Sequence, residues 1–121
     1  MFEVSVEQSF ASGHALRNYH GKCESVHGHN YKVRITVAGE QLDATGLLVD
    51  FAQVKRLMGE VIEYLDHRFI NDLPPFDQLN PSAENIAKYF YDRVHAGLND
   101  GARISEVKIW ETDTSSAVYR P

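Results

Sequence analysis

The spacing of apolar residues changes along the chain, and it predicts strands at both ends with helices between them. Apolar and polar residues alternate over residues 2–10, which is the period of a strand with one covered face. Alternation returns over residues 29–39, and two further strands are expected at about residues 103–112 and 117–120. A short extended piece is expected at residues 47–49.

Two helices are expected between the strand pairs. After Asp50, apolar residues recur every three and four positions, which is the buried stripe of a helix of about four turns. Asp50 and Gln53 have the spacing of a capping box that would begin this helix. For the second helix, Asn80 is the expected N-cap, Pro81 the expected first residue, and the turn at residues 99–101 the expected end.

The order strand, strand, helix, helix, strand, strand predicts an α+β fold. In this class a four-stranded antiparallel sheet carries both helices on one face. A chain of 121 residues is long enough for one core, so a single domain over residues 1–121 is expected. The edge strands of such a sheet are free to pair with another subunit, so oligomerisation through the edges is also expected.

Composition narrows the kind of protein further. Hydrophobic residues make up 43% and charged residues 24%, as in ordinary globular proteins. The formal net charge of -5, without a Lys/Arg cluster, argues against a nucleic-acid partner. No apolar run reaches membrane-spanning length, and the first residues begin no signal peptide. A single cysteine excludes an intrachain disulfide, so a cytoplasmic protein is expected.

Three histidines lie where the first two strands would meet. His14 follows the first strand, while His27 and His29 lie at the start of the second and share a face with Tyr31. If these strands pair as a hairpin, all three imidazoles meet at one end of the sheet. Three nitrogen ligands leave a position open, as in a catalytic zinc site, whereas Cys23 as fourth ligand would give a closed structural site. Without a metal, His14 is an ordinary, partly exposed loop residue.

The loop at residues 17–26 carries the only cysteine, Cys23, between Lys22 and Glu24. A free cysteine is usually a small buried hydrophobe, but these polar neighbours fit poorly with a core position. Lys22 or a nearby metal would lower the thiol pKa from ~8.5 and populate the thiolate, which acts as base or nucleophile. Glu24 is either a solvated loop carboxylate or a second group of the site.

Two carboxylates further along the chain are also candidates for the site. Asp66 and His67 end the first helix, and a carboxylate beside an imidazole can set its tautomer and basicity. Because adjacent side chains point in different directions, each is expected to pair with another group. Glu111 shares a strand face with Val107 and Ile109, so it is expected to point toward a pocket, unless the strand frays there. A buried carboxylate needs donors, which an amino-substituted heterocycle provides.

Together these residues resemble the 6-pyruvoyltetrahydropterin synthase / 6-carboxytetrahydropterin synthase family over nearly the whole chain. The most specific part is Cys23-x-x-x-His27-Gly-His29-Asn-Tyr31. Supporting motifs are Phe10-x-x-x-His14, Val49-Asp50-Phe51, Leu65-Asp66-His67, Asn80-Pro81-x-x-Glu84-Asn85 and Trp110-Glu111-Thr112.

The resemblance implies a tunnelling fold, in which trimers pair their sheets into a β-barrel and two trimers stack into a hexamer. It implies zinc on His14, His27 and His29, and 7,8-dihydroneopterin triphosphate as the substrate. The metal would polarise the oxygens of the substrate side chain and acidify its C–H bonds.

The resemblance also implies roles for the other candidate residues. Cys23 would be the base that abstracts protons, and Asp66 and His67 would assist proton transfer. Glu111 would anchor the pterin ring.

Within the family, the gap of three residues between Cys23 and His27 resembles the bacterial 6-carboxytetrahydropterin synthases. These enzymes serve the queuosine (7-deazapurine) pathway and release acetaldehyde with triphosphate, whereas the animal-type 6-pyruvoyl enzymes have a longer gap. Glu24 stands where a third branch, which makes 6-hydroxymethyl-7,8-dihydropterin for folate, has its catalytic glutamate. The resemblance therefore implies a 6-carboxytetrahydropterin synthase, with folate-type cleavage as a possible side activity. A non-catalytic zinc- or pterin-binding module is the alternative from another class.

Overall fold

The structure is a computed structural model that describes residues 1–98 and 101–121, with the backbone but not the side chain of Cys23. Its elements are β1 (Phe2–His14), η1 (Lys22–Glu24), β2 (His27–Gly39), α1 (Phe51–Leu65), η2 (Ile70–Asp72), α2 (Ala83–Gly97), β3 (Arg103–Thr112) and β4 (Ser115–Tyr119). The two η elements are single 3₁₀ turns. The predicted order of strands and helices is confirmed.

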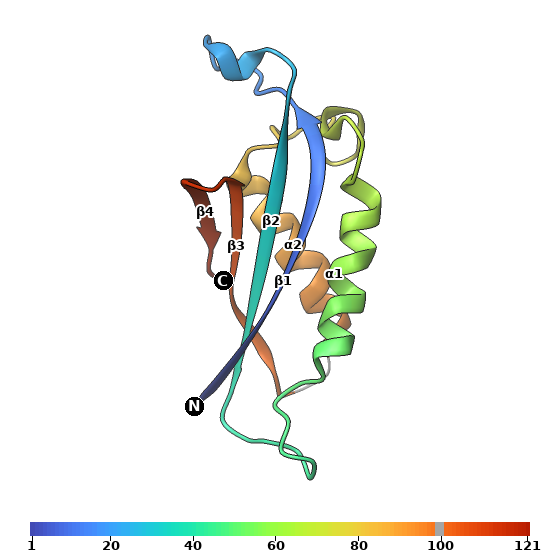
Figure 1. The fold of residues 1–121 in the computed structure, drawn as a ribbon, viewed down its shortest axis with the longest axis vertical. Coiled ribbons are helices and arrows are strands. Elements are labelled where there is room, and N and C mark those ends of the chain that lie inside the picture. The colour runs from blue at the N-terminus through green and yellow to red at the C-terminus, as the bar shows by residue number, and fades with distance from the viewer. Residues whose placement is uncertain (99–100) are drawn as a thin grey trace.

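The strands form one antiparallel sheet in the order β1-β2-β3-β4. Both helices cover the same face of this sheet, with α1 against β1 and α2 against β3 and β4 (Figure 1). The predicted α+β architecture is therefore confirmed. Within the part of the chain that the structure describes, no helix is both long and apolar enough to cross a membrane.

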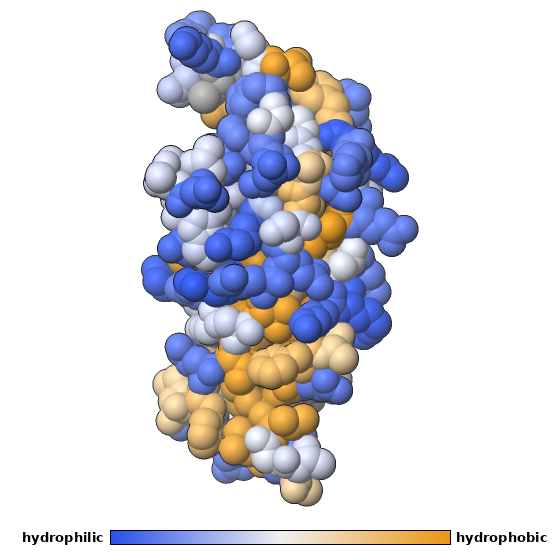
Figure 2. All heavy atoms as spheres, viewed as in Figure 1, coloured by the Kyte–Doolittle hydropathy of each residue, from blue (hydrophilic) through white to orange (hydrophobic). Residues whose placement is uncertain are grey.

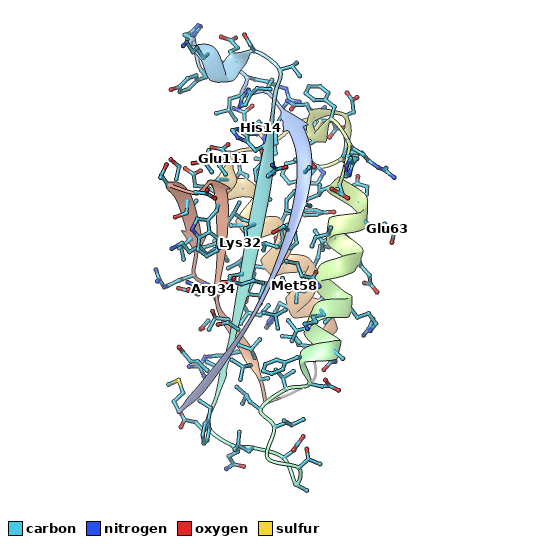
Figure 3. All side chains as sticks on the ribbon, in the orientation of Figure 1. His14, Lys32, Arg34, Met58, Glu63 and Glu111 are labelled. Atoms are coloured by element: carbon cyan, nitrogen blue, oxygen red, sulfur yellow. The ribbon has the colours of Figure 1, made fainter. Side chains whose placement is uncertain are left out.

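The core lies between the sheet and the helices because each element turns its apolar face inward. In Figure 3, Met58 points from α1 toward the sheet, while Glu63 lies on the opposite side of the same helix. Met58 is fully buried, as are Val33 and Ile35 on the facing strand β2. Burying one side chain of this size contributes about 1.5–3 kcal/mol, so this layer supplies most of the energy that holds the helices on the sheet.

The other face of the sheet is polar. Lys32 and Arg34 alternate with the buried residues of β2 and stand out from the sheet (Figure 3). The Lys32 ammonium lies 4.2 Å, and the Arg34 guanidinium 5.2 Å, from the centre of the Trp110 ring on β3. Figure 2 shows that apolar side chains gather instead at the lower end of the molecule. Met1, Phe2 and Leu47 are among the exposed apolar residues.

β1 and β2 are longer than the apolar pattern predicts. β1 was expected to end at residue 10 but continues to His14, and β2 begins at His27 instead of residue 29. The extra residues pair in register, with Ser12 opposite His29 and His14 opposite His27. Alternation stops earlier because small and polar residues follow Phe10, whereas the backbone ladder does not depend on side-chain polarity.

Three other expected boundaries are corrected. β4 covers Ser115–Tyr119, not residues 117–120, because it pairs with β3 directly after a tight turn. Residues 48 and 49 form a bend, and no strand is formed over residues 47–49. α2 ends at Gly97, before the predicted stop at residues 99–101, of which 99 and 100 lie outside the described residues.

The helix caps are only partly as predicted. Asp50 does cap α1, because its side chain accepts a hydrogen bond from the Ala52 N–H at 2.8 Å. Gln53 does not complete a capping box, since it donates to the carbonyl of Gly97 at 3.4 Å.

At α2, Ser82 is the N-cap, and Asn80 and Pro81 precede the helix. The prediction that Asn80 caps α2 is wrong because its carboxamide is bonded to the backbone of Arg17.

Candidate metal centre

Pairing of β1 and β2 brings three histidines to one end of the sheet. His14 is the last residue of β1 and lies opposite His27, the first residue of β2. His29 lies two residues further along β2 and therefore on the same face. One ligand nitrogen from each ring lies within 4.8 Å of the other two. The convergence expected from a hairpin is therefore present in the structure, at the end of the sheet where Figure 3 labels His14.

Backbone carbonyls fix the orientation of two of these rings. His14 Nδ1 donates to the carbonyl of Pro81 at 2.7 Å, and His27 Nδ1 donates to the carbonyl of Ser25 at 2.7 Å. A carbonyl can only accept, so Nδ1 carries hydrogen in both rings and Nε2 faces the group. The Nε2 of His29 is buried and has no hydrogen-bond partner among the described residues. All three rings thus present Nε2 to the same point.

Glu111 on β3 points into the same group. Its Oε1 lies 3.2 Å from His14 Nε2 and 3.6 Å from His29 Nε2. The close contact with His14 Nε2 holds the pKa of the Glu111 carboxyl below its usual value, although burial opposes this shift. Burial lowers the pKa of His29, against the opposing charge of Glu111. An ionised carboxylate and a neutral imidazole both favour a bound cation.

The contact between His14 and His27 shows that the group suits a metal ion. Their Nε2 atoms lie only 3.0 Å apart. With both Nδ1 atoms donating to carbonyls, the neutral rings would place two lone pairs at this distance, which is unfavourable unless a cation lies nearby. A proton or a metal ion removes the repulsion. Three imidazole nitrogens are the ligands of a catalytic zinc site with an open position, so this donor set fits zinc.

Asp66 and His67 lie beside β1 and pair with each other, which corrects the expectation that each would pair with another group. His67 Nδ1 lies 2.9 Å from Asp66 Oδ2. His67 has φ 56°, in the left-handed region, and this backbone turn allows its ring to face the preceding carboxylate. The Ala11 N–H donates to Asp66 Oδ1 at 2.9 Å, and the His67 N–H donates to the Ala11 carbonyl at 2.6 Å. The pair is therefore fixed to β1, three residues before His14.

The environment keeps the Asp66 carboxylate charged. Hydrogen bonds, first from the Ala11 N–H and then from His67, hold the pKa of Asp66 below its usual value. The side chain of His67 is 81% exposed, so its ring is open to solvent. His67 and His29 line the same shallow, open hollow of about 380 Å³ over the paired ends of β1 and β2.

Of the two loop candidates, the structure describes the side chain of Glu24 alone, and Glu24 is not one of the converging groups. Glu24 is exposed, and its Oε2 accepts from the His20 N–H at 3.0 Å. The backbone of Cys23 is part of η1, which projects beyond the end of the sheet (Figure 1), and its side chain lies outside the described residues. The structure thus joins Glu111 to the three histidines and places the carboxylate of Glu24 elsewhere.

Tyr31 and Pro81 contact the histidines and were not predicted as site residues. Tyr31 is fully buried, its hydroxyl has no partner among the described residues, and burial raises its pKa. Its ring stands edge-on to His29, with centroids 5.5 Å apart. The shared strand face of His27, His29 and Tyr31 is the signal that could have identified it. The carbonyl of Pro81 leaves no such signal, because a backbone acceptor is the same in every residue.

The fold and this group define a small α+β protein with a candidate metal centre at one end of a four-stranded antiparallel sheet. The sequence pattern of the family described as 6-pyruvoyl tetrahydropterin synthase matches residues 3–121. The chain therefore belongs to the 6-pyruvoyl tetrahydropterin synthase family.

Individual relatives agree with this assignment. The chain is 39% identical to 6-carboxy-5,6,7,8-tetrahydropterin synthase of Bacillus subtilis, covering 99% of this chain and 86% of the relative. It is 36% identical to human 6-pyruvoyl tetrahydrobiopterin synthase, covering 98% and 90% of the two chains. The structure of 6-pyruvoyl tetrahydropterin synthase from Caenorhabditis elegans superimposes with a TM-score of 0.87 at 27% identity, covering 100% of this chain and 97% of the other.

Proposed function

We propose that the protein is a zinc-dependent lyase of queuosine biosynthesis. It converts 7,8-dihydroneopterin triphosphate and one water molecule into 6-carboxy-5,6,7,8-tetrahydropterin, acetaldehyde and triphosphate. The observation that carries the proposal is the convergence of His14, His27 and His29 beside the Glu111 carboxylate. The choice of product is supported by the 39% identity to a 6-carboxy-5,6,7,8-tetrahydropterin synthase and by the gap of three residues between Cys23 and His27.

His14, His27 and His29 would hold the zinc through Nε2, in the orientation that the carbonyls of Pro81 and Ser25 already impose. Bound zinc supplies Lewis acidity, which makes C–H bonds next to a coordinated oxygen easier to deprotonate. The open position of a three-histidine site is where the substrate side chain would enter.

Glu111 is proposed to bind the pterin ring. Its carboxylate is ionised, partly buried and next to the histidines, so it can accept hydrogen bonds from the amino group and a ring N–H of the pterin. Two hydrogen bonds from adjacent donors to one carboxylate fix the orientation of the pterin ring. They thereby also position the substrate side chain, which is the part that reacts.

Proton transfer is assigned to Cys23, Asp66 and His67. The Asp66 carboxylate faces His67 Nδ1, which leaves His67 Nε2 free to accept or give up a proton at the solvent-exposed side of the ring. Cys23 is proposed as the base that removes the substrate proton, because it occupies the cysteine position of the family motif and the thiolate is the reactive form.

The proposed assembly is a homohexamer in which sheets join into a barrel. β1 and β4 are the edge strands that would pair between subunits. The single cysteine suits a reducing cytoplasm, which is the proposed location.

Two other products are alternatives that the same experiment separates. The human relative, at 36% identity, is named for the 6-pyruvoyl product. Glu24 occupies the position of the folate-type catalytic glutamate, and its Oε2 accepts a hydrogen bond from the His20 N–H.

The test is to incubate zinc-loaded protein with 7,8-dihydroneopterin triphosphate and to identify the pterins by mass. We expect 6-carboxytetrahydropterin and acetaldehyde as the main products. A main product of 6-hydroxymethyl-7,8-dihydropterin would assign the reaction to Glu24, and Glu24→Ala should then abolish it. Zinc binding without any turnover would overturn the proposal in favour of a binding module.

A further inference from the structure

We propose that Asn71 and Asn80 are positioning residues that set the metal affinity of the histidine group. Their side chains bind the backbone of Ala15 and Arg17, which follow His14 in the chain. The inference rests on the proposed role of the three histidines as metal ligands. Asn71 and Asn80 lie outside the two sequence motifs that contain these histidines.

The side chains of Asn71 and Asn80 continue the pairing of β1 after its last residue, His14. Asn71 Oδ1 accepts from the Ala15 N–H at 2.9 Å, and Asn71 Nδ2 donates to the Ala15 carbonyl at 2.9 Å. Asn80 makes the same two bonds with Arg17, each at 2.9 Å. Each carboxamide therefore satisfies both backbone groups of one residue, as a neighbouring strand would.

This clamp is connected directly to the imidazole of His14. Pro81, next to Asn80, accepts the hydrogen bond from His14 Nδ1 at 2.7 Å. The same short segment thus holds the backbone after His14 and the far side of its ring. His14 and Pro81 are both buried, so neither can shift without moving the other.

Arg17 strengthens the connection from the other side. Its guanidinium donates to the carbonyl of Phe76 at 2.8 Å and to the carbonyls of Asn71 and Leu79, both at 3.4 Å. Since the three acceptors lie in η2 and in the segment between η2 and α2, the chain after His14 and the chain before α2 form one hydrogen-bonded unit.

The asparagines are not needed to hold the segment before α2 in place. Phe76 is fully buried in the core, and Asn85 Nδ2 donates to the Asn80 carbonyl at 2.9 Å from the first turn of α2. The two carboxamides instead hold the backbone of Ala15 and Arg17 in position. These two residues in turn hold His14 in position. Outer groups that orient a metal-binding histidine typically change metal affinity by about 10–100-fold.

The test measures the zinc dissociation constant of the unsubstituted protein, Asn71→Ala and Asn80→Ala by competition with a chromophoric chelator. The absorption spectrum of the cobalt(II)-loaded proteins reports ligand geometry independently of turnover. Asp50→Ala is the matched control, because it removes the N-cap of α1 at the other end of the molecule (Figure 1) and so lowers stability without touching the clamp.

We expect both asparagine variants to bind zinc about tenfold or more weakly and to change the cobalt spectrum, while Asp50→Ala lowers Tm with unchanged zinc affinity. Zinc affinities within twofold of the unsubstituted protein in both asparagine variants would overturn the inference and leave the metal site intact. No zinc or cobalt uptake by the unsubstituted protein would instead overturn the proposed function.

Asn80→Asp keeps the test decisive if the alanine variants do not fold. The aspartate retains an oxygen that accepts from the Arg17 N–H but loses the donor to the Arg17 carbonyl. Weaker zinc binding in the folded Asn80→Asp protein supports the inference, and unchanged binding overturns it.

Discussion

Asp66 and His67 are neighbours in the chain and also partners, with Asp66 Oδ2 2.9 Å from His67 Nδ1. Such a contact requires an unusual backbone, and the positive φ of His67 provides it. Hydrogen bonds to the backbone of Ala11 then hold the pair against β1. The candidate site therefore has two parts, the three histidines with Glu111 and the Asp66–His67 pair, and β1 contributes to both.

The Asp66 carboxylate should contribute to stability in a pH-dependent way. Its pKa in the folded protein lies below the unfolded value of about 3.9. The contribution is therefore complete above that unfolded value and is lost as pH falls through the lower, folded pKa. Asp66→Asn cannot ionise, so its urea midpoint should fall less steeply with acidification than that of the unsubstituted protein.

The control for this prediction is Asp92→Asn, which alters an exposed carboxylate paired with Lys88 on α2. Its midpoint should follow the unsubstituted protein more closely than Asp66→Asn does. Identical acid profiles for Asp66→Asn and the unsubstituted protein would show that the Ala11 hydrogen bond does not depend on the charge.

Removal of a histidine from the group should abolish stoichiometric metal binding. His27→Ala and His29→Ala each remove one of three converging nitrogens, so zinc affinity should fall by more than the roughly 10–100-fold expected for an outer group. Metal content after dialysis measures this, and His20→Ala, in the exposed loop, is the control. Full zinc retention by His29→Ala would remove that residue from the ligand set.

Zinc affinity should depend on pH because protons compete for the same nitrogens. Burial lowers the pKa of His29 below the usual value of about 6.5, so its lone pair remains available in mildly acidic solution. Affinity should therefore decline with falling pH, and the proton on His29 should begin to compete at a lower pH than it would on an imidazole in water. Dissociation constants measured between about pH 5 and 8 should show the steeper decline at the acidic end.

Glu111→Gln should separate substrate binding from metal binding. The glutamine has nearly the same shape but no charge, and charge-assisted hydrogen bonds contribute about 1.5–3 kcal/mol, so KM for the pterin should rise by roughly 10–100-fold. Zinc content should stay stoichiometric. Loss of zinc from Glu111→Gln would show instead that the carboxylate, 3.2 Å from His14 Nε2, serves mainly to hold the metal.

Cys23→Ala should abolish turnover without releasing the metal. The expectation follows from the role of Cys23 as base, since three histidines suffice to hold zinc. Single-turnover assays and metal analysis of the same preparation measure both quantities. If the variant loses zinc together with turnover, Cys23 is a fourth ligand of a closed structural site.

The local pattern of apolar and polar residues predicted the features that depend only on residues close together in the chain. The period of two on β1 and β2 determines which residues share a face, so His27, His29 and Tyr31 could be placed together before the fold was known. The hairpin then brings His14 opposite His27. The stripe of α1 and its Asp50 cap were predictable for the same reason, because a helix repeats every few residues.

Only the tertiary structure decided how these parts are held. Asn80 has the sequence context of a helix cap, yet it binds the backbone of Arg17, because the segment before α2 lies against the chain leaving β1. The hydrogen bond from His14 Nδ1 to the carbonyl of Pro81 joins residues that are 67 positions apart in the chain. Its acceptor is a backbone oxygen, which any residue would provide. Contacts of this kind follow from the packing of distant segments and leave no period in the sequence.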